Sequence, residues 1–155
     1  MRPYGPTILR LCVGAVFFAH GTQKLLGVWG GPGIHGTISM VAHLGLPYPT
    51  LLAALVILTE FVGSILLMTG ALARWAALAL VIEMGVATWK VHWRNGFFLN
   101  WNITPGRGHG IEFNLVLIGA LLCLLLIGPG ALSFDERRSR SREARAAGRA
   151  RIRKV

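Results

Sequence analysis

Ionisable residues inside long apolar segments are the feature of this sequence with the clearest potential for chemistry. His20 and Lys24 lie in the first such segment, Glu60 in the second and Glu83 in the third, and Glu112 opens the fourth. An ionisable side chain in the middle of a lipid bilayer costs about 3 kcal/mol or more, so such side chains are rare and face a partner or a cavity. These five residues therefore predict a polar site enclosed by helices.

The depths of these residues indicate one shared site. At a rise of about 1.5 Å per residue, Glu60 and Glu83 each lie about 15 Å below the outer membrane boundary, and His20 lies about 10 Å below it. The predicted cluster contains His20, Gln23, Lys24, Glu60, Glu83, Lys90 and Glu112. Two interpretations stay open: ion pairs that fix helix packing, or a pocket for a quinone headgroup, a proton path or a polar substrate. No catalytic role is assigned to any of the seven.

Four apolar segments position these side chains, over residues 7–27, 51–72, 75–93 and 113–132. Each contains about 20 residues, which as a helix spans about 30 Å, the thickness of the hydrocarbon core. The chain is 54% hydrophobic and 14% charged, with a mean hydropathy of +0.57, so it is far more apolar than an ordinary soluble domain. We expect an all-α integral membrane protein in which residues 1–135 form one four-transmembrane-helix bundle with up-down-up-down topology.

Basic residues indicate the orientation of this bundle. Residues 136–155 carry nine Lys and Arg residues, whereas the first loop, residues 28–50, carries none. Because Lys and Arg are retained on the cytoplasmic side of a membrane, we expect both termini in the cytoplasm. Lys90, Arg94 and Arg107 fall on the outer side and disagree, but the residues of the tail outnumber them.

The basic tail, residues 136–155, shows no apolar periodicity, and we expect it to be disordered or bound to a partner. Its charge suits anionic lipid, to which each basic residue near the surface contributes about 1 kcal/mol. It also suits nucleic acid or an acidic protein surface. Its position directly after a membrane segment favours lipid headgroups or another subunit of a membrane complex over a specific nucleic acid.

The cysteines and the remaining histidines offer less chemistry. Cys12 and Cys123 each lie about 7 Å from the cytoplasmic boundary and could meet, but the chain has no C-x-x-C pair. A thiol-oxidising enzyme is therefore not indicated, and two small buried apolar residues are the favoured interpretation. Four histidines lack the spacing of metal ligands, so no metal site is predicted. They are His35, His43, His92 and His109.

Several short motifs together resemble the DoxX family of small bacterial membrane proteins, over about residues 8–135. The motifs are His20-Gly21-x-Gln23-Lys24, Glu60 with Gly63, Arg74, Gly96-Phe97-Phe98, Glu112 and Gly128-Pro129-Gly130. No single motif is specific, but their combination is. The basic tail extends beyond the part that resembles the family.

The resemblance implies a four-helix bundle in the cytoplasmic membrane and an association with redox systems. The family includes a subunit of an archaeal thiosulfate:quinone oxidoreductase and proteins linked to oxidative-stress defence complexes. We therefore expect an accessory subunit of a respiratory or redox complex. A quinone-reducing subunit of such an oxidoreductase, or a small transporter, is the alternative. The sequence shows no haem, flavin or iron–sulfur motif, so a quinone is the one cofactor considered, and whether the chain is an enzyme stays open.

Overall fold

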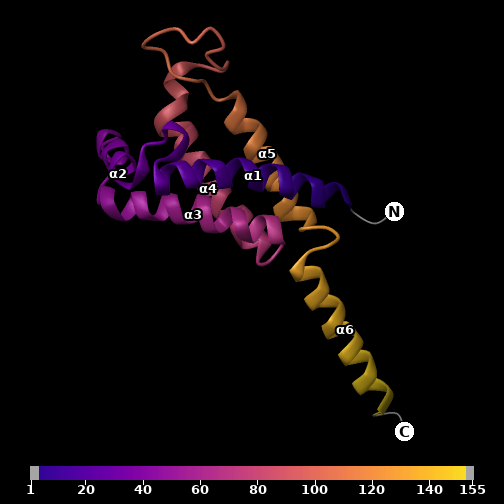
Figure 1. Ribbon diagram of the computed structural model, residues 1–155. Helices are drawn as coiled ribbons and strands as arrows, with labels where there is room; N and C mark the ends of the chain where they lie inside the picture. The colour runs from indigo at the N-terminus through magenta and orange to yellow at the C-terminus, as the bar shows by residue number, and fades with distance from the viewer. Residues whose placement is uncertain (1–3, 153–155) are drawn as a thin grey trace.

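The computed structural model describes residues 4–152, and its side chains over residues 4–146. Six α-helices form this part of the chain, and it contains no strand (Figure 1). The helices are α1 (Tyr4–Leu26), α2 (Gly33–His43), α3 (Pro49–Thr69), α4 (Ala73–Ala87), α5 (Glu112–Ile127) and α6 (Phe134–Ile152). The predicted all-α class is therefore correct for the described residues.

Four of the helices form a closed bundle. α1 packs against α3 and α5, and α4 packs against α3 and α5, so each helix has two neighbours and the ring closes. In Figure 1, α1 and α3 lie side by side, and α4 and α5 cross them at an angle. The short helix α2 covers one end of the α1–α3 pair. Large buried side chains from all four helices fill the centre: Phe17, Leu67, Leu80 and Leu121.

Small residues allow α1 and α3 to approach closely. A Cβ atom added at Gly21 would lie 2.6 Å from the backbone nitrogen of Phe61. A Cβ atom added at Gly14 would likewise lie 2.4 Å from the side chain of Met68. These two glycines are seven residues apart and share one face of α1. Close backbone approach at such positions is a common way for helices to associate in lipid.

By length and composition, α3 is the one described helix that could cross a membrane by itself. α1 meets the same criterion only together with the segment Val28–His43, from which it is bent by 109°, and α5 is apolar but shorter. Large apolar side chains are nevertheless exposed all around the bundle, including Leu58, Ile82 and Leu126. An exposed apolar surface of this kind fits a helical protein that contacts lipid.

Two helices differ in length from the predicted segments. α5 ends at Ile127, five residues before the predicted end at Leu132, because Gly128 has φ of 98° and Pro129 follows it. α4 ends at Ala87, and a π-helical turn over Thr88–His92 continues it toward the predicted end at Trp93. The other predicted ends lie within three residues of the observed ones.

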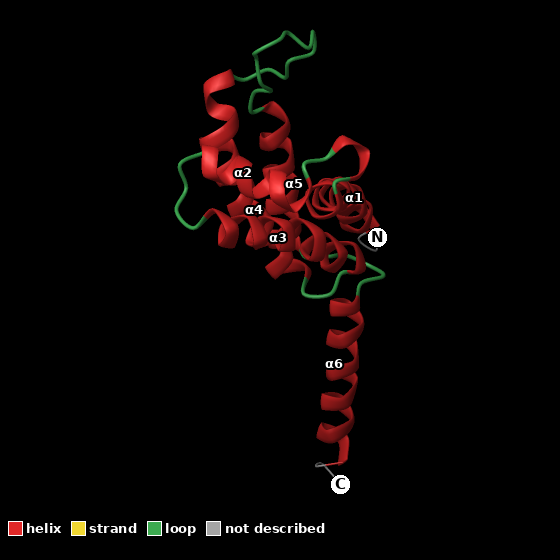
Figure 2. Ribbon diagram, turned by 60° about the vertical axis from the view of Figure 1, so that its left-hand side comes forward, coloured by secondary structure: helices red, strands yellow, loops and turns green. Residues whose placement is uncertain are grey.

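The basic tail contains a helix, α6, whereas the sequence analysis predicts a disordered or partner-bound segment. Ala, Arg and Glu are strong helix formers, which explains how this stretch is helical without an apolar face. α6 leaves the bundle and extends away from it in both Figure 1 and Figure 2. The last residues of the predicted tail, 153–155, lie outside the described residues.

The two cysteines differ from the expected pair of buried residues. Cys12 and Cys123 are both exposed on the surface of the bundle, and neither forms a disulfide. Their positions on α1 and α5 turn them away from the bundle interior, which Val13 and Leu124, their neighbours in sequence, occupy instead.

Candidate functional site

The centre of the candidate site is an ion pair between α1 and α3. The Nζ atom of Lys24 lies 2.6 Å from Oε1 of Glu60 and contacts Oε2 as well. The side chain of Glu60 is 4% exposed and that of Lys24 is 17% exposed. Since an ammonium group and a carboxylate attract strongly where water is excluded, this pair binds α1 to α3.

The packing of α1 on α3 brings the two charges together. Gly21 lies against the backbone of Glu60 and Phe61, where any larger residue would clash. Lys24 follows Gly21 by almost one helical turn, so its side chain starts from the same face of α1. The glycine thus determines how closely α1 approaches α3, and the lysine spans the remaining gap to Glu60.

Glu83, on α4, is the third member of the cluster. It lies close enough to Glu60 and Lys24 to interact electrostatically with both. Its Oε2 atom is buried and has no hydrogen-bond partner among the residues that the structure describes. The site therefore combines one ammonium group with two carboxyl groups, and one buried carboxyl oxygen has no partner in the described structure.

The first helix contributes one of the three predicted side chains. His20 is exposed and lies at the edge of the face of α1 that meets α3, on which Phe17 and Gly21 are buried. Gln23 donates a hydrogen bond of 3.3 Å from Nε2 to the backbone oxygen of Trp29, outside the cluster. Of the two cations expected near the acids, the structure uses Lys24 and not His20.

Lys90 and Glu112 also lie apart from the cluster. The Nζ atom of Lys90 lies 4.1 Å from the ring centre of Trp89, in a cation–π contact within the π-helical turn. Glu112 begins α5, where a negative charge is favourable beside the positive end of the helix dipole. Neither residue forms an ion pair within the part of the chain that the structure describes. The predicted seven-residue cluster is thus reduced to Lys24, Glu60 and Glu83.

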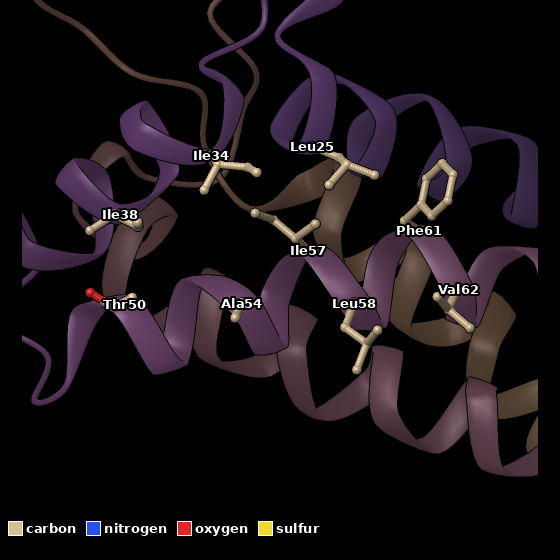
Figure 3. A pocket seen from close by; sticks show the side chains of 9 residues that line it. All are labelled: Leu25, Ile34, Ile38, Thr50, Ala54, Ile57, Leu58, Phe61 and Val62. Carbon is tan, nitrogen blue, oxygen red and sulfur yellow. The ribbon is translucent and has the colours of Figure 1, made fainter.

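The bundle also contains an apolar groove, which none of the three charged residues lines (Figure 3). It has a volume of about 350 Å³ and is formed by α2, α3 and the end of α1. Ile57 and Phe61 line it, and they flank Glu60 in the sequence of α3. Phe61 also stacks on Phe18, with ring centres 5.3 Å apart. The groove is therefore lined by apolar side chains, with Thr50 as its one polar lining residue, and pockets for small molecules are mostly apolar in this way.

No metal centre is evident near this site. Over residues 4–152, no group of three His, Cys, Asp or Glu side chains is placed to hold a metal ion. The chemistry that the cluster itself offers is hydrogen bonding, charge pairing and proton transfer.

Sequence reasoning assigned no role to Arg10, which is the most extensively bonded side chain in the bundle. Its guanidinium group is 2% exposed and donates hydrogen bonds to four backbone carbonyls. The acceptors are Leu67 and Met68 at the end of α3, and Pro129 and Leu132 before α6. The signal was visible in the sequence, since Arg10 is an ionisable residue inside an apolar segment, as His20 is.

Comparison with protein families gives one match, to a model described as DoxX, over residues 5–93. The inner membrane protein YphA of Escherichia coli is 32% identical to this chain, over 88% of the chain and 91% of YphA. The uncharacterized membrane protein Rv3486 of Mycobacterium tuberculosis is 34% identical, over 85% of the chain and 80% of that protein.

A further relative carries a name that refers to an activity. The Bacillus subtilis protein named "Putative oxidoreductase CatD" is 27% identical, over 84% of both chains. No solved structure matches the chain significantly. The matches together extend over most of the bundle, and they connect it with proteins of bacterial membranes.

Proposed function

Because the chain belongs to the DoxX family of membrane proteins, we propose that it is an accessory subunit of a respiratory or redox complex in the bacterial inner membrane. In this proposal the bundle is a compact membrane scaffold, and Lys24, Glu60 and Glu83 form its polar centre. A larger partner supplies the redox centres.

The buried Lys24–Glu60 pair is the observation that carries this proposal. Breaking a buried ion pair costs about 3–5 kcal/mol in soluble proteins, so the pair holds α1 firmly on α3. A bundle in which an ion pair holds α1 on α3 offers a rigid surface to other subunits. The name of CatD, which refers to an oxidoreductase, supports the link to redox chemistry.

The proposed topology has four membrane spans and two cytoplasmic termini. Arg10 joins the N-terminal half of α1 to the end of α3 and to the linker before α6. The N-terminal part of the chain, the α3–α4 turn and α6 therefore meet at one end of the bundle. Arg74 and the arginines of α6 lie at this end as well, and the positive-inside rule assigns such an end to the cytoplasm. An alkaline phosphatase fusion at the C-terminus should be inactive, and an active fusion would contradict this topology.

The accessory role can be tested by native purification. The tagged protein, solubilised from its own membranes with a mild detergent, should migrate on a native gel at a mass well above that of a monomer. Mass spectrometry of that band should identify a subunit that carries a redox cofactor. A protein that migrates alone, under conditions that keep known respiratory complexes intact, would contradict the proposal.

Quinone binding is a second candidate function, favoured by the apolar groove that α2, α3 and the end of α1 form. Its apolar wall could hold a quinone ring or the start of its prenyl chain. In this version the polar cluster also moves the protons that accompany quinone reduction.

Binding of decylubiquinone to the purified protein in detergent would test this second function. Phe61→Ala should weaken binding about tenfold, because it removes the aromatic wall of the groove. Leu126→Ala, at an exposed apolar position on α5, is the matched control and should leave binding unchanged. Equal affinities in the three proteins would exclude the groove as the quinone site.

A further inference from the structure

The helix α6 presents a row of arginines along one of its faces. Arg138, Arg142 and Arg145 follow one another at spacings of four and three residues, which puts them on the same side of an α-helix. All side chains of residues 137–146 are exposed, so this arginine stripe is open to a partner. The stripe became recognisable only when the structure showed that the tail is helical.

Acidic residues of α6 lie on the other side of the helix. Glu136 and Glu143 are seven residues apart and share a face, about 140° around the axis from the arginine stripe at about 100° per residue. Glu136 forms an ion pair with Arg140, which lies off the stripe. Residues 135–155 contain nine basic and three acidic residues, so two copies of α6 would repel each other. The charge pattern therefore suits a different partner that is acidic on one side.

The base of α6 is fixed to the bundle. Both carboxylate oxygens of Asp135 accept hydrogen bonds of 3.0 Å, one from the backbone N–H of Leu72 and one from that of Ala73, at the start of α4. The backbone N–H of Asp135 in turn donates to Gly70. A helix rooted in this way projects its arginines in a defined direction, away from the bundle (Figure 2).

This direction carries two of the three arginines away from the lipid headgroups. The proposed topology places the α3–α4 turn, and with it Asp135, at the membrane surface. For a helix that extends outward, Arg138 lies about 5 Å, Arg142 about 11 Å and Arg145 about 15 Å from that surface. Electrostatic attraction is screened over about 8 Å at physiological ionic strength. Surface-bound helices also insert an apolar face into the membrane, whereas the face of α6 opposite the stripe carries the charged residues Glu136, Arg140 and Glu143.

A nucleic-acid groove suits α6 less well than a flat surface does. A helix in the major groove has phosphates on both sides, and Glu136 and Glu143 would then face negative charge. An acidic protein surface contacts only one face of the helix. We propose that Arg138, Arg142 and Arg145 dock an acidic, helical surface of a partner subunit on the cytoplasmic side.

A direct binding experiment tests this proposal. The full-length protein is held in phosphatidylcholine nanodiscs, which carry no net charge, in buffer with about 0.15 M salt. The probe is a labelled helical peptide with glutamates at spacings of four and three residues. Its control peptide has the same composition, with the glutamates distributed around the helix. Fluorescence anisotropy should show tighter binding of the striped peptide, and equal binding would overturn the proposal.

Two variants with equal loss of charge identify the face that binds. Arg138→Gln/Arg142→Gln/Arg145→Gln should weaken binding of the striped peptide about tenfold, since three exposed ion pairs are lost. Arg137→Gln/Arg140→Gln/Arg151→Gln should weaken it less than about threefold. Equal losses of affinity would mean that the peptide responds only to the net charge of α6, and would overturn the proposal. Glutamine keeps the helix propensity of arginine, and circular dichroism checks that α6 remains folded.

The other two partner classes are separate arms of the same experiment. Binding to phosphatidylserine vesicles and to a short DNA duplex is measured with the same variants. If either binds more tightly than the acidic peptide and depends on the stripe, the proposal is overturned in favour of that class of partner. The docking surface rests on the proposed topology only where lipid headgroups are excluded as its partner. Failure to bind the peptide would therefore contradict the docking surface, while native purification tests the accessory role independently.

Discussion

At the scale of single residues, the buried cluster joins one cation to two acids. If Lys24 and Glu60 depend on each other, Glu60→Gln leaves an unpaired ammonium group and destabilises the protein by at most about 3–5 kcal/mol. The pair Lys24→Gln/Glu60→Gln leaves no unpaired charge, so it should cost less than the sum of the two single changes. Thermal unfolding in detergent measures all three variants. Strict additivity would show that these residues do not share a site.

The ion pair of α6 is the matched control for this cycle. Glu136 and Arg140 are also in direct contact, but their side chains are 28% and 58% exposed. Exposed pairs four residues apart on a helix contribute only about 0.3–0.5 kcal/mol. Their double-mutant cycle should therefore be almost additive, which would show that burial, and not the contact alone, produces the coupling at Lys24.

Glu83 should respond differently from Glu60. Its Oε2 atom has no partner in the described structure, so Glu83→Gln removes no ion pair and leaves a group of nearly the same size. We expect an unfolding temperature close to that of the unmodified protein, while any quinone-linked or proton-linked activity of the assembled complex falls. Retained activity in Glu83→Gln would mean that the free oxygen has no functional role.

Spacing and depth along the sequence were enough to select Lys24, Glu60 and Glu83, because apolar surroundings leave buried charges few partners. They were not enough for His20. Depth alone does not specify which side of a helix faces inward, and in α1 that side is specified by the close contact of Gly21 with Phe61. Arg10 was missed for a related reason: its partners are backbone carbonyls, which no side-chain pattern reveals.

At the scale of elements, the contact between α1 and α3 depends on Gly21. Gly21→Ala would place a Cβ atom 2.6 Å from the backbone of Phe61, and backbone cannot move aside as a flexible side chain can. Forced overpacking of this kind costs about 1–3 kcal/mol, and separation of the helices should also weaken the Lys24–Glu60 pair. Thermal unfolding in detergent should show the loss.

Gly119, in the middle of α5, provides the control for this substitution. Nothing lies within 4 Å of a Cβ atom added there. Alanine favours a helix interior by up to about 1 kcal/mol over glycine, so Gly119→Ala should be neutral or stabilising. If both variants lost stability equally, close packing at Gly21 would not be the cause.

The positions of the helices were predicted well because long apolar runs mark the segments of the chain that are helical. Their ends depended on finer features, such as the positive φ of Gly128 that ends α5 early. The helical state of the tail could not be predicted from apolar periodicity, because the stability of α6 comes from helix propensity and from its anchored base.

At the scale of the whole molecule, Arg10 closes one end of the bundle. It joins α1, the end of α3 and the linker before α6 through hydrogen bonds to four backbone carbonyls. Hydrogen bonds to a charged group contribute about 1.5–3 kcal/mol each, so Arg10→Gln should lower stability by at least about 3 kcal/mol. Arg74→Gln is the control, because Arg74 is exposed and makes one long contact of 3.4 Å. A similar small loss in both variants would show that Arg10 does not hold this end together.

Removal of α6 separates the role of its base from the role of its arginines. A chain that ends after Arg140 keeps Asp135, which caps the start of α4, and loses most of the arginine stripe. Its unfolding temperature should stay close to that of the full chain, while its share of the high-mass native band should fall sharply. Asp135→Ala in the full chain should cost about 1 kcal/mol, the usual effect of losing a helix cap, and because it keeps all the arginines, it should reduce the high-mass band less than the truncation does. If the shortened chain unfolded at a much lower temperature but still assembled, α6 would be part of the fold, and its arginines would not be a docking surface.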